Sequence, residues 1–118
     1  METIDRAAVI VTPKKPFYDW ANSLDPQDPV SVDELDEKET VYLVPERDSN
    51  EQIEKLLQRS LWREIFEQEL FAWHTDESGW PENLSYAMFR EWFDIKICSM
   101  VFDVEDGAIL KESALGEE

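Results

Sequence analysis

The sequence predicts an α+β fold, a two-layer sandwich in which a small three-stranded, mostly antiparallel sheet has a long helix and a shorter helix on one face. Two observations support this prediction. Three short runs rich in apolar and β-branched residues are bounded by turn residues, and one long segment without glycine or proline has helical periodicity. The predicted order is β-α-β-α-α-β. Its three strands and the two substantial ones of its three helices are enough for one layer of each.

The first strand is predicted at residues 7–11 (AAVIV), because the length and β-branching of this run favour a buried strand. A short helix is predicted at residues 16–24, since Pro16 is suited to a first helical turn. Asp25 precedes a proline and is therefore pushed out of the helical region, which ends this helix. The acidic stretch at residues 25–39 is predicted to be a solvated surface loop.

The second strand is predicted at residues 40–45 (TVYLVP). Ser49 and Gln52 then match the capping box, in which a side chain at the N-cap and one three residues later satisfy free backbone N–H groups. The long helix predicted from there extends over residues 50–73 and contains many strong helix formers. Residues 75–79 break it.

The last two elements are a helix predicted at about residues 85–93 and a strand predicted at residues 95–104 (IKICSMVFDV). Alternate side chains of this strand are largely apolar on both faces. The strand is therefore expected to be central and covered on both sides, or to place its second face against another subunit. Two helices do not readily cover both faces of a sheet, and this favours a homodimer or an obligate partner.

The long helix has two apolar rows that lie on different sides at about 100° per residue. The first row consists of Ile53, Leu57, Leu61 and Ile65, and the second of Trp62, Phe66, Leu70 and Trp73. One interpretation is that the sheet covers the first row and the aromatic segment at residues 80–93 folds over the second. The other is that part of the second row stays exposed and binds a partner or a second copy.

The second interpretation defines a set of candidate partner-binding residues. Arginine and tryptophan are typical interface anchors, and they occur together on and beside the second row. The candidates are Arg59, Trp62, Arg63, Phe66, Trp73 and Trp80. Cation–π packing of the same arginines within the monomer is the alternative.

Length and charge limit the organisation and the partners. The 118 residues are predicted to form one domain at residues 1–110 and an acidic, frayed tail at residues 111–118. The net charge of −17 favours protein partners with basic surfaces and disfavours direct binding to nucleic acid or to an anionic membrane. The start of the chain lacks the pattern of a secretory signal and no apolar run approaches a bilayer's thickness, which predicts a cytoplasmic protein.

Few residues are available for a catalytic or cofactor site. The three glycines, Gly79, Gly107 and Gly116, lie far apart, which argues against the known phosphate-binding loops. His74 is the only histidine and is expected to cap the long helix, where a cation complements the helix dipole. Cys98 is the only cysteine, so no disulfide forms within the chain. We therefore predict no catalytic residue, no metal site and no cofactor.

Three stretches together resemble a family of small uncharacterised bacterial proteins. They are residues 13–24 (PKKPFYDWANSL), 40–46 (TVYLVPE) and 80–106 (WPENLSYAMFREWFDIKICSMVFDVED). The shared features are a proline–aromatic turn, a strand that ends in Val-Pro-Glu, and Trp-Pro followed by Phe-x-x-Trp-Phe. The resemblance covers most of the chain and implies a bacterial cytoplasmic protein, but it implies no activity, cofactor or site residue.

Three functions are compatible with these features, and we prefer the first. It is a small interaction or regulatory module that binds a protein through an aromatic surface. The second is an acidic decoy that mimics nucleic acid, although bases interleaved with acids on the long helix weaken this hypothesis. The third is an enzyme or metal-binding protein, which requires a pocket lined by His74 or by carboxyl groups with perturbed pKa values.

Overall fold

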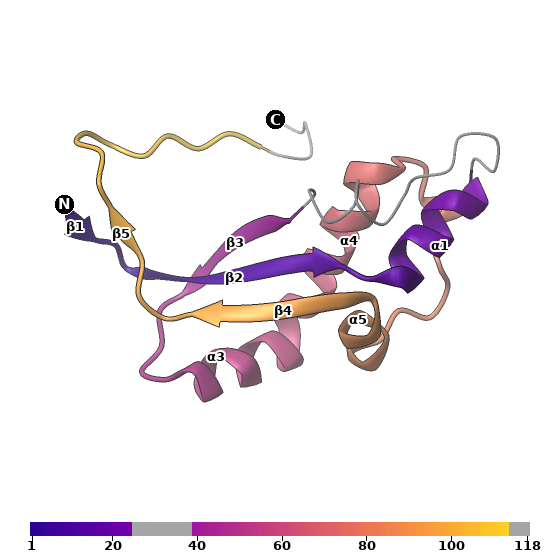
Figure 1. Cartoon of the computed structure of the whole chain (residues 1–118), viewed down its shortest axis with the longest axis horizontal. Coiled ribbons are helices and arrows are strands. Elements are labelled where there is room, and N and C mark those ends of the chain that lie inside the picture. The colour runs from indigo at the N-terminus through magenta and orange to yellow at the C-terminus, as the bar shows by residue number, and fades with distance from the viewer. Residues whose placement is uncertain (25–38, 114–118) are drawn as a thin grey trace.

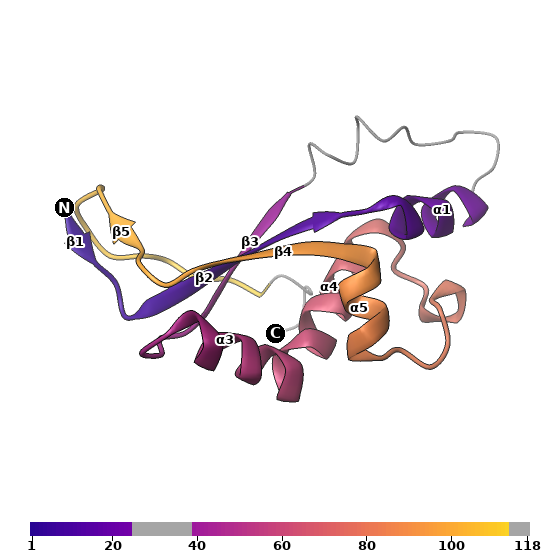
Figure 2. The ribbon, with the colours of Figure 1, turned by 60° about the horizontal axis from the view of Figure 1, so that its bottom comes forward.

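The main sheet has three antiparallel strands, and helices cover one of its faces (Figures 1 and 2). The computed structural model describes residues 1–24 and 39–113. Strand β2 (Arg6–Pro13) is central and lies between β3 (Thr40–Pro45) and β4 (Phe93–Cys98). The predicted α+β fold, with a three-stranded antiparallel sheet, a long helix and shorter helices, is therefore confirmed.

The helices occur in the predicted order along the chain. They are α1 (Lys15–Leu24), α3 (Asn50–Leu56), the π-helical segment η1 (Leu57–Leu61), α4 (Trp62–Trp73), the 3₁₀ turn η2 (Glu77–Gly79) and α5 (Tyr86–Trp92). Within the described ranges, no helix combines the length and the apolar character that crossing a bilayer requires.

The two faces of the sheet differ in what covers them. The register pairs Val9 of β2 with Tyr42 of β3 and with Ile97 of β4, so these three side chains point to the same face. This face meets the helices, and Val9 is fully buried there. On the opposite face Val41 and Leu43 are exposed. The core therefore lies between the sheet and the helices (Figure 2).

Ser49 begins the long helix, as predicted. Its Oγ accepts a hydrogen bond from the backbone N–H of Gln52 at 3.2 Å. In a capping box the side chain of Gln52 would accept a hydrogen bond from the backbone N–H of Ser49. Here its Oε1 accepts instead from the backbone N–H of Asp48, one residue earlier. Helical structure then continues over residues 50–73 through α3, η1 and α4, and His74 is the C-cap residue.

The π-helical segment η1 explains how the two apolar rows reach one core. The backbone N–H of Trp62 donates to the carbonyl of Leu57, five residues earlier. A π turn contains an extra residue, so it rotates the faces of the following helix relative to a regular α-helix. Leu57 at the start of η1 and Phe66 after it are both fully buried in the same core. The expectation that the rows lie on different sides assumed a regular helix throughout, and η1 corrects it.

The aromatic segment that ends in α5 and β4 folds over the second row, as the first interpretation predicts. Phe66 packs against Phe89, Trp92 and Phe93, with ring centroids 5.9, 5.5 and 5.4 Å apart. Such tilted and edge-on pairs are favourable arrangements of aromatic rings. Phe66 and Phe89 are fully buried. The cluster fixes α4 and α5 against one end of the sheet.

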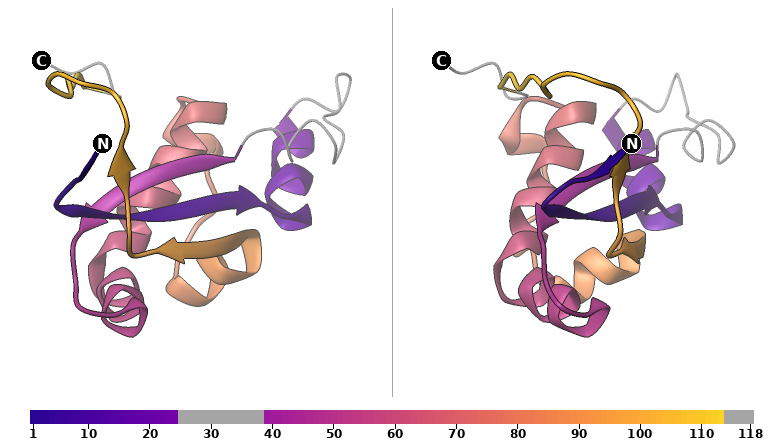
Figure 3. Two further views of the ribbon diagram at one scale, coloured as in Figure 1. Left: turned by 60° about the vertical axis from the view of Figure 1, so that its left-hand side comes forward. Right: turned by 90° about the vertical axis from the view of Figure 1, so that its left-hand side faces the viewer.

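The last strand is shorter than predicted and is not central. β4 ends at Cys98, opposite Ala8 near the start of β2, which leaves few residues of β2 for further pairing. The chain leaves the main sheet there, and β5 (Phe102–Asp103) pairs with β1 (Glu2–Thr3) in a separate ribbon (Figure 3). The prediction of one central strand at residues 95–104 was therefore wrong. The homodimer inferred from it stays a prediction.

Two predicted segments lie mostly outside the described residues. They are the acidic loop at residues 25–39, of which only Glu39 is described, and the acidic tail at residues 111–118, which is described as far as residue 113.

Candidate functional site

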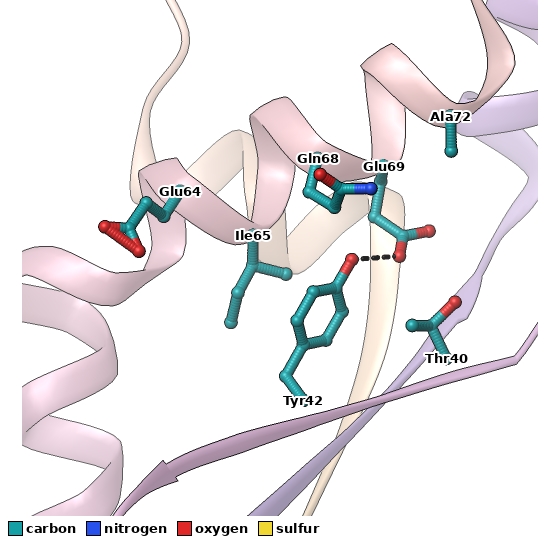
Figure 4. A pocket seen from close by; sticks show the side chains of 7 residues that line it. All are labelled: Thr40, Tyr42, Glu64, Ile65, Gln68, Glu69 and Ala72. Atoms are coloured by element: carbon teal, nitrogen blue, oxygen red, sulfur yellow. Dashed lines mark hydrogen bonds between the residues drawn. The ribbon is translucent and has the colours of Figure 1, made fainter. Parts of the chain in front are cut away.

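A pocket of about 480 Å³ lies between strand β3 and helix α4 (Figure 4). It is lined by Thr40 and Tyr42 from the strand and by Glu64, Ile65, Gln68, Glu69 and Ala72 from the helix. The strand residues alternate and the helix residues recur at intervals of three and four, so each element contributes one face. Glu64 and Ala72 are exposed, whereas Ile65 and Glu69 are buried. The pocket therefore extends from solvent towards the core.

Glu69 is the most distinctive residue of the pocket, because only 8% of its surface is exposed. The hydroxyl of Tyr42 donates a hydrogen bond to Oε2 of Glu69 at 2.5 Å (Figure 4). Buried carboxyl groups are rare unless they have such partners. Among residues 1–24 and 39–113, Glu69 is the only charged residue that is buried. The other buried residues in these ranges are apolar, so a carboxyl group is unusual in this core.

Burial determines the protonation of the pair. It raises the pKa of Glu69, and hydrogen bonds from Tyr42 and Thr40 oppose this rise. Burial also raises the pKa of Tyr42, and the neighbouring charge of Glu69 adds to the effect. The Tyr42 hydroxyl therefore keeps its proton at neutral pH and acts as a donor, while Glu69 is the group whose charge can respond to a ligand.

The sequence contains a signal for Glu69, although Glu69 is not among the residues predicted to bind a partner. Ile53, Leu57, Leu61 and Ile65 recur at intervals of four, and the next position in this row is Glu69. An acid that continues an apolar row faces the core rather than solvent. Tyr42 was also recognisable, since every second residue of β3 points to the helix side.

Strand β3 is an edge of the sheet, beside α4 (Figure 3). Among the described residues it pairs with β2 alone, through a six-residue register. Pro45 at its end is typical of an edge strand, because proline has no N–H to donate to a neighbour. An edge strand presents backbone N–H and C=O groups to any further chain. The pocket thus lies on the helix side of a sheet edge.

The residues predicted to bind a partner lie elsewhere, along α4 and beyond its ends. Phe66 is fully buried in the aromatic cluster and has no surface to offer. Trp62 and Trp73 are half-buried at opposite ends of α4, about 16 Å apart along the helix axis. Trp80 is also half-buried, and its indole N–H donates to the carbonyl of His74 at 2.8 Å.

The two predicted arginines are exposed. The Arg63 guanidinium lies 5.3 Å from the ring centroid of Trp62 and forms an ion pair with Glu67 at 3.3 Å. Arg59 borders a smaller hollow beside Lys55. The structure thus brings Arg63 and Trp62 together, as the cation–π alternative expects, and neither residue lines the pocket. Whether they contact a partner stays a prediction.

The metal-binding alternative requires His74 or carboxyl groups as ligands, and Asp76 is an acidic residue close to His74 in the sequence. The carboxylate of Asp76 accepts hydrogen bonds from the backbone N–H and the hydroxyl of Ser78, and these bonds lower its pKa. Among the described residues, no three histidine, cysteine or acidic side chains cluster as ligands of a metal ion would.

Comparisons of the chain with models of protein families, with curated proteins and with solved structures gave no match. The resemblance to small bacterial proteins therefore stays a prediction.

Proposed function

We propose that this protein is an interaction module that binds a partner with a basic surface in the pocket between β3 and α4. The observation that supports this most directly is Glu69, a buried carboxyl group that lines an open pocket. The net charge of −17 adds a long-range attraction for basic partners. We place the module in the cytoplasm, in keeping with the free thiol of Cys98.

The chemistry of Glu69 favours a cationic group as its ligand. A carboxylate can accept about four hydrogen bonds, and a guanidinium or ammonium group supplies donors together with the opposite charge. Glu64 and Gln68 add further acceptor oxygens to the same pocket. Its volume lies within the range of about 300–1,000 Å³ that is typical of ligand sites. An arginine or lysine side chain therefore fits both the charge and the space.

The proposal can be tested by an NMR titration with N-acetylarginine methylamide, against neutral N-acetylcitrulline methylamide as the control ligand. We expect the arginine compound to shift the amide signals of Thr40, Tyr42 and Gln68 in a saturable way. Glu69→Gln should abolish these shifts. Glu91→Gln, which removes the same charge from an exposed position of α5, should leave them unchanged. Equal shifts with the citrulline compound would contradict the proposal.

The flank of α4 that contains Trp62 and Arg63 is the alternative contact surface, and it corresponds to the aromatic surface predicted from the sequence. Signals that shift there and not around Tyr42 would favour it. The decoy hypothesis depends on the acidic loop at residues 25–39 and on the tail at residues 111–118, most of which is not described.

An enzyme is the second candidate, because the raised pKa of Glu69 is typical of a general acid. Among the described residues that line the pocket, none is a histidine, cysteine or lysine that would serve as nucleophile or base. Turnover of chromogenic aryl esters, glycosides or phosphates that Glu69→Gln abolishes would favour catalysis. We expect no turnover that depends on Glu69.

A further inference from the structure

We propose that the partner binds as an extended segment that adds a strand to the outer edge of β3, which pairs with no described strand other than β2, and places one arginine or lysine side chain beside Glu69. This inference rests on the proposed function and specifies how the partner enters the pocket.

The position of the pocket relative to the sheet edge is the first argument. A strand added to β3 would lie about 4.8 Å beyond it. The pocket is bounded by the helix-side residues of β3 and by α4, so an added strand would pass directly beside it. A groove between an edge strand and a helix is a recurrent site for strand addition, in which main-chain hydrogen bonds provide affinity and side-chain pockets provide specificity.

The composition of β3 is the second argument. Natural edge strands are commonly protected by lysine or other charged side chains. The six residues of β3, TVYLVP, contain no charged residue, and Pro45 is the one protective residue, at the end of the strand. Within the described part of the chain, no other strand pairs with this edge.

The alternation of β3 predicts the pattern of the bound segment. Side chains of an added strand would point alternately to the two faces of the sheet. One is the helix side, where Tyr42 and Glu69 lie, and the other is the opposite face, where Val41 and Leu43 are exposed. A basic residue on the helix side meets the carboxyl group. Apolar residues before and after it would pack beside Val41 and Leu43, as cross-strand pairs do. The geometry thus points to an apolar–basic–apolar pattern.

Four synthetic heptapeptides test this inference with the full chain. The first has a central arginine between two valines and threonine elsewhere, and the second replaces the arginine by citrulline. The third and fourth keep the arginine but are N-methylated, one at alternate backbone nitrogens and one at the intervening nitrogens. Only one of these two sets of N–H groups can face β3, so each methylated peptide is the control for the other.

We expect the arginine peptide to bind at least about tenfold more tightly than the citrulline peptide, since its hydrogen bond to Glu69 joins two charged groups whereas the donor in citrulline is neutral. One N-methylated peptide should lose binding and the other should retain it. Amide hydrogen exchange at alternate residues of β3 should slow when the arginine peptide binds.

Equal binding of both N-methylated peptides, or unchanged exchange along β3, would overturn strand addition. The proposed function would then still stand if arginine remained preferred over citrulline in a manner that depends on Glu69. Loss of that preference in the wild type would overturn both. Dimerisation of the free protein with slow exchange along β3 would show that a second copy occupies this edge instead, and would also overturn the inference.

Discussion

The two edge strands of the sheet meet the helices in different ways. β4 follows α5 directly, and its first residue, Phe93, is almost fully buried among Phe17, Phe66 and Phe89, each 5.4 Å away between ring centroids. β3 instead faces α4 across a pocket, where Tyr42 and Glu69 are joined by a hydrogen bond. One edge is filled by aromatic rings and the other retains an open, partly polar space.

The difference suggests separate roles for the two edges: the aromatic packing at β4 stabilises the fold, and the pocket at β3 has space for a ligand. Rings that interlock bury apolar area without polar atoms and stabilise the fold. A buried carboxyl group loses its hydration, and its hydrogen bonds only partly compensate. A side that retains such a group is therefore a better candidate for binding than the side that is filled.

The largest expected effect is on the filled side. Phe66→Ala should lower the free energy of unfolding by about 3–5 kcal/mol, because it leaves a cavity in the aromatic cluster. Phe71→Ala, at a half-exposed position of the same helix, is the matched control and should cost about 1 kcal/mol or less. Urea unfolding measures both. Equal losses would show that the aromatic cluster is not the main source of stability in α4.

A smaller effect is expected at the pocket. Tyr42→Phe removes the hydroxyl that donates to buried Glu69, and it should cost about 1–3 kcal/mol at neutral pH. Tyr18→Phe on α1 is the matched control, with an expected change within about 0.5 kcal/mol. Urea unfolding at pH 7 compares the two. An unchanged stability of Tyr42→Phe would mean that the hydrogen bond to Glu69 makes no net contribution.

The pH dependence of stability separates the two sides further. Because burial raises the pKa of Glu69 above its ordinary value of about 4.5, the folded state binds this proton more tightly than the unfolded state. The contribution of protonated Glu69 to the free energy of unfolding is therefore fully present below pH 4.5, and it is lost as the pH rises through the pKa of Glu69 in the folded state. Glu69→Gln resembles the protonated form and should lack this loss, so its stability relative to the wild type should increase with pH and then level off.

The same unfolding series on Glu91→Gln provides the control for that experiment. Glu91 is exposed on α5, so a rise of the same size in Glu91→Gln would show that the effect comes from removing any negative charge and not from buried Glu69. A constant difference between Glu69→Gln and the wild type over the whole range would show that Glu69 titrates as it does in the unfolded chain.

The smallest effect is expected on the outer flank of α4. Arg63→Ala removes an exposed ion pair with Glu67 and the contact with Trp62, and it should change the free energy of unfolding by about 0.5 kcal/mol. Binding of the arginine heptapeptide should be unaffected. If Arg63→Ala weakened binding more than Glu69→Gln does, the predicted aromatic–arginine surface would replace the pocket as the contact site.

Much of the fold could be predicted from local patterns. The strand at residues 40–45 and the N-cap at Ser49 follow from composition and spacing. The cover of Phe66 by the last aromatic segment was one of two interpretations that the sequence left open. The position of β4 at an edge could not, because pairing depends on contacts between residues far apart in the sequence. The π-helical segment was also missed. The apolar rows were placed with the same rotation of about 100° for every residue of the helix, and this assumption does not allow for the extra residue in a π turn.

The candidate site was less predictable than the fold. Tryptophan and arginine drew attention to the Trp62 row, yet Phe66 is in the core and the arginines lie apart from the pocket. Glu69 was one of 28 acidic residues, and only its place in the row of Ile53 and Ile65 distinguishes it. A carboxyl group is recognised as a site by its burial, and burial here depends on how β3 packs against α4.

We propose above that Glu69 recognises a basic side chain in the pocket beside β3. The most direct test is the effect of exchanging arginine for citrulline in the heptapeptide, measured by calorimetry on the wild type and on Glu69→Gln. We predict that the exchange weakens binding to the wild type at least about tenfold and leaves binding to Glu69→Gln nearly unchanged. The same loss of affinity in both proteins would contradict the claim.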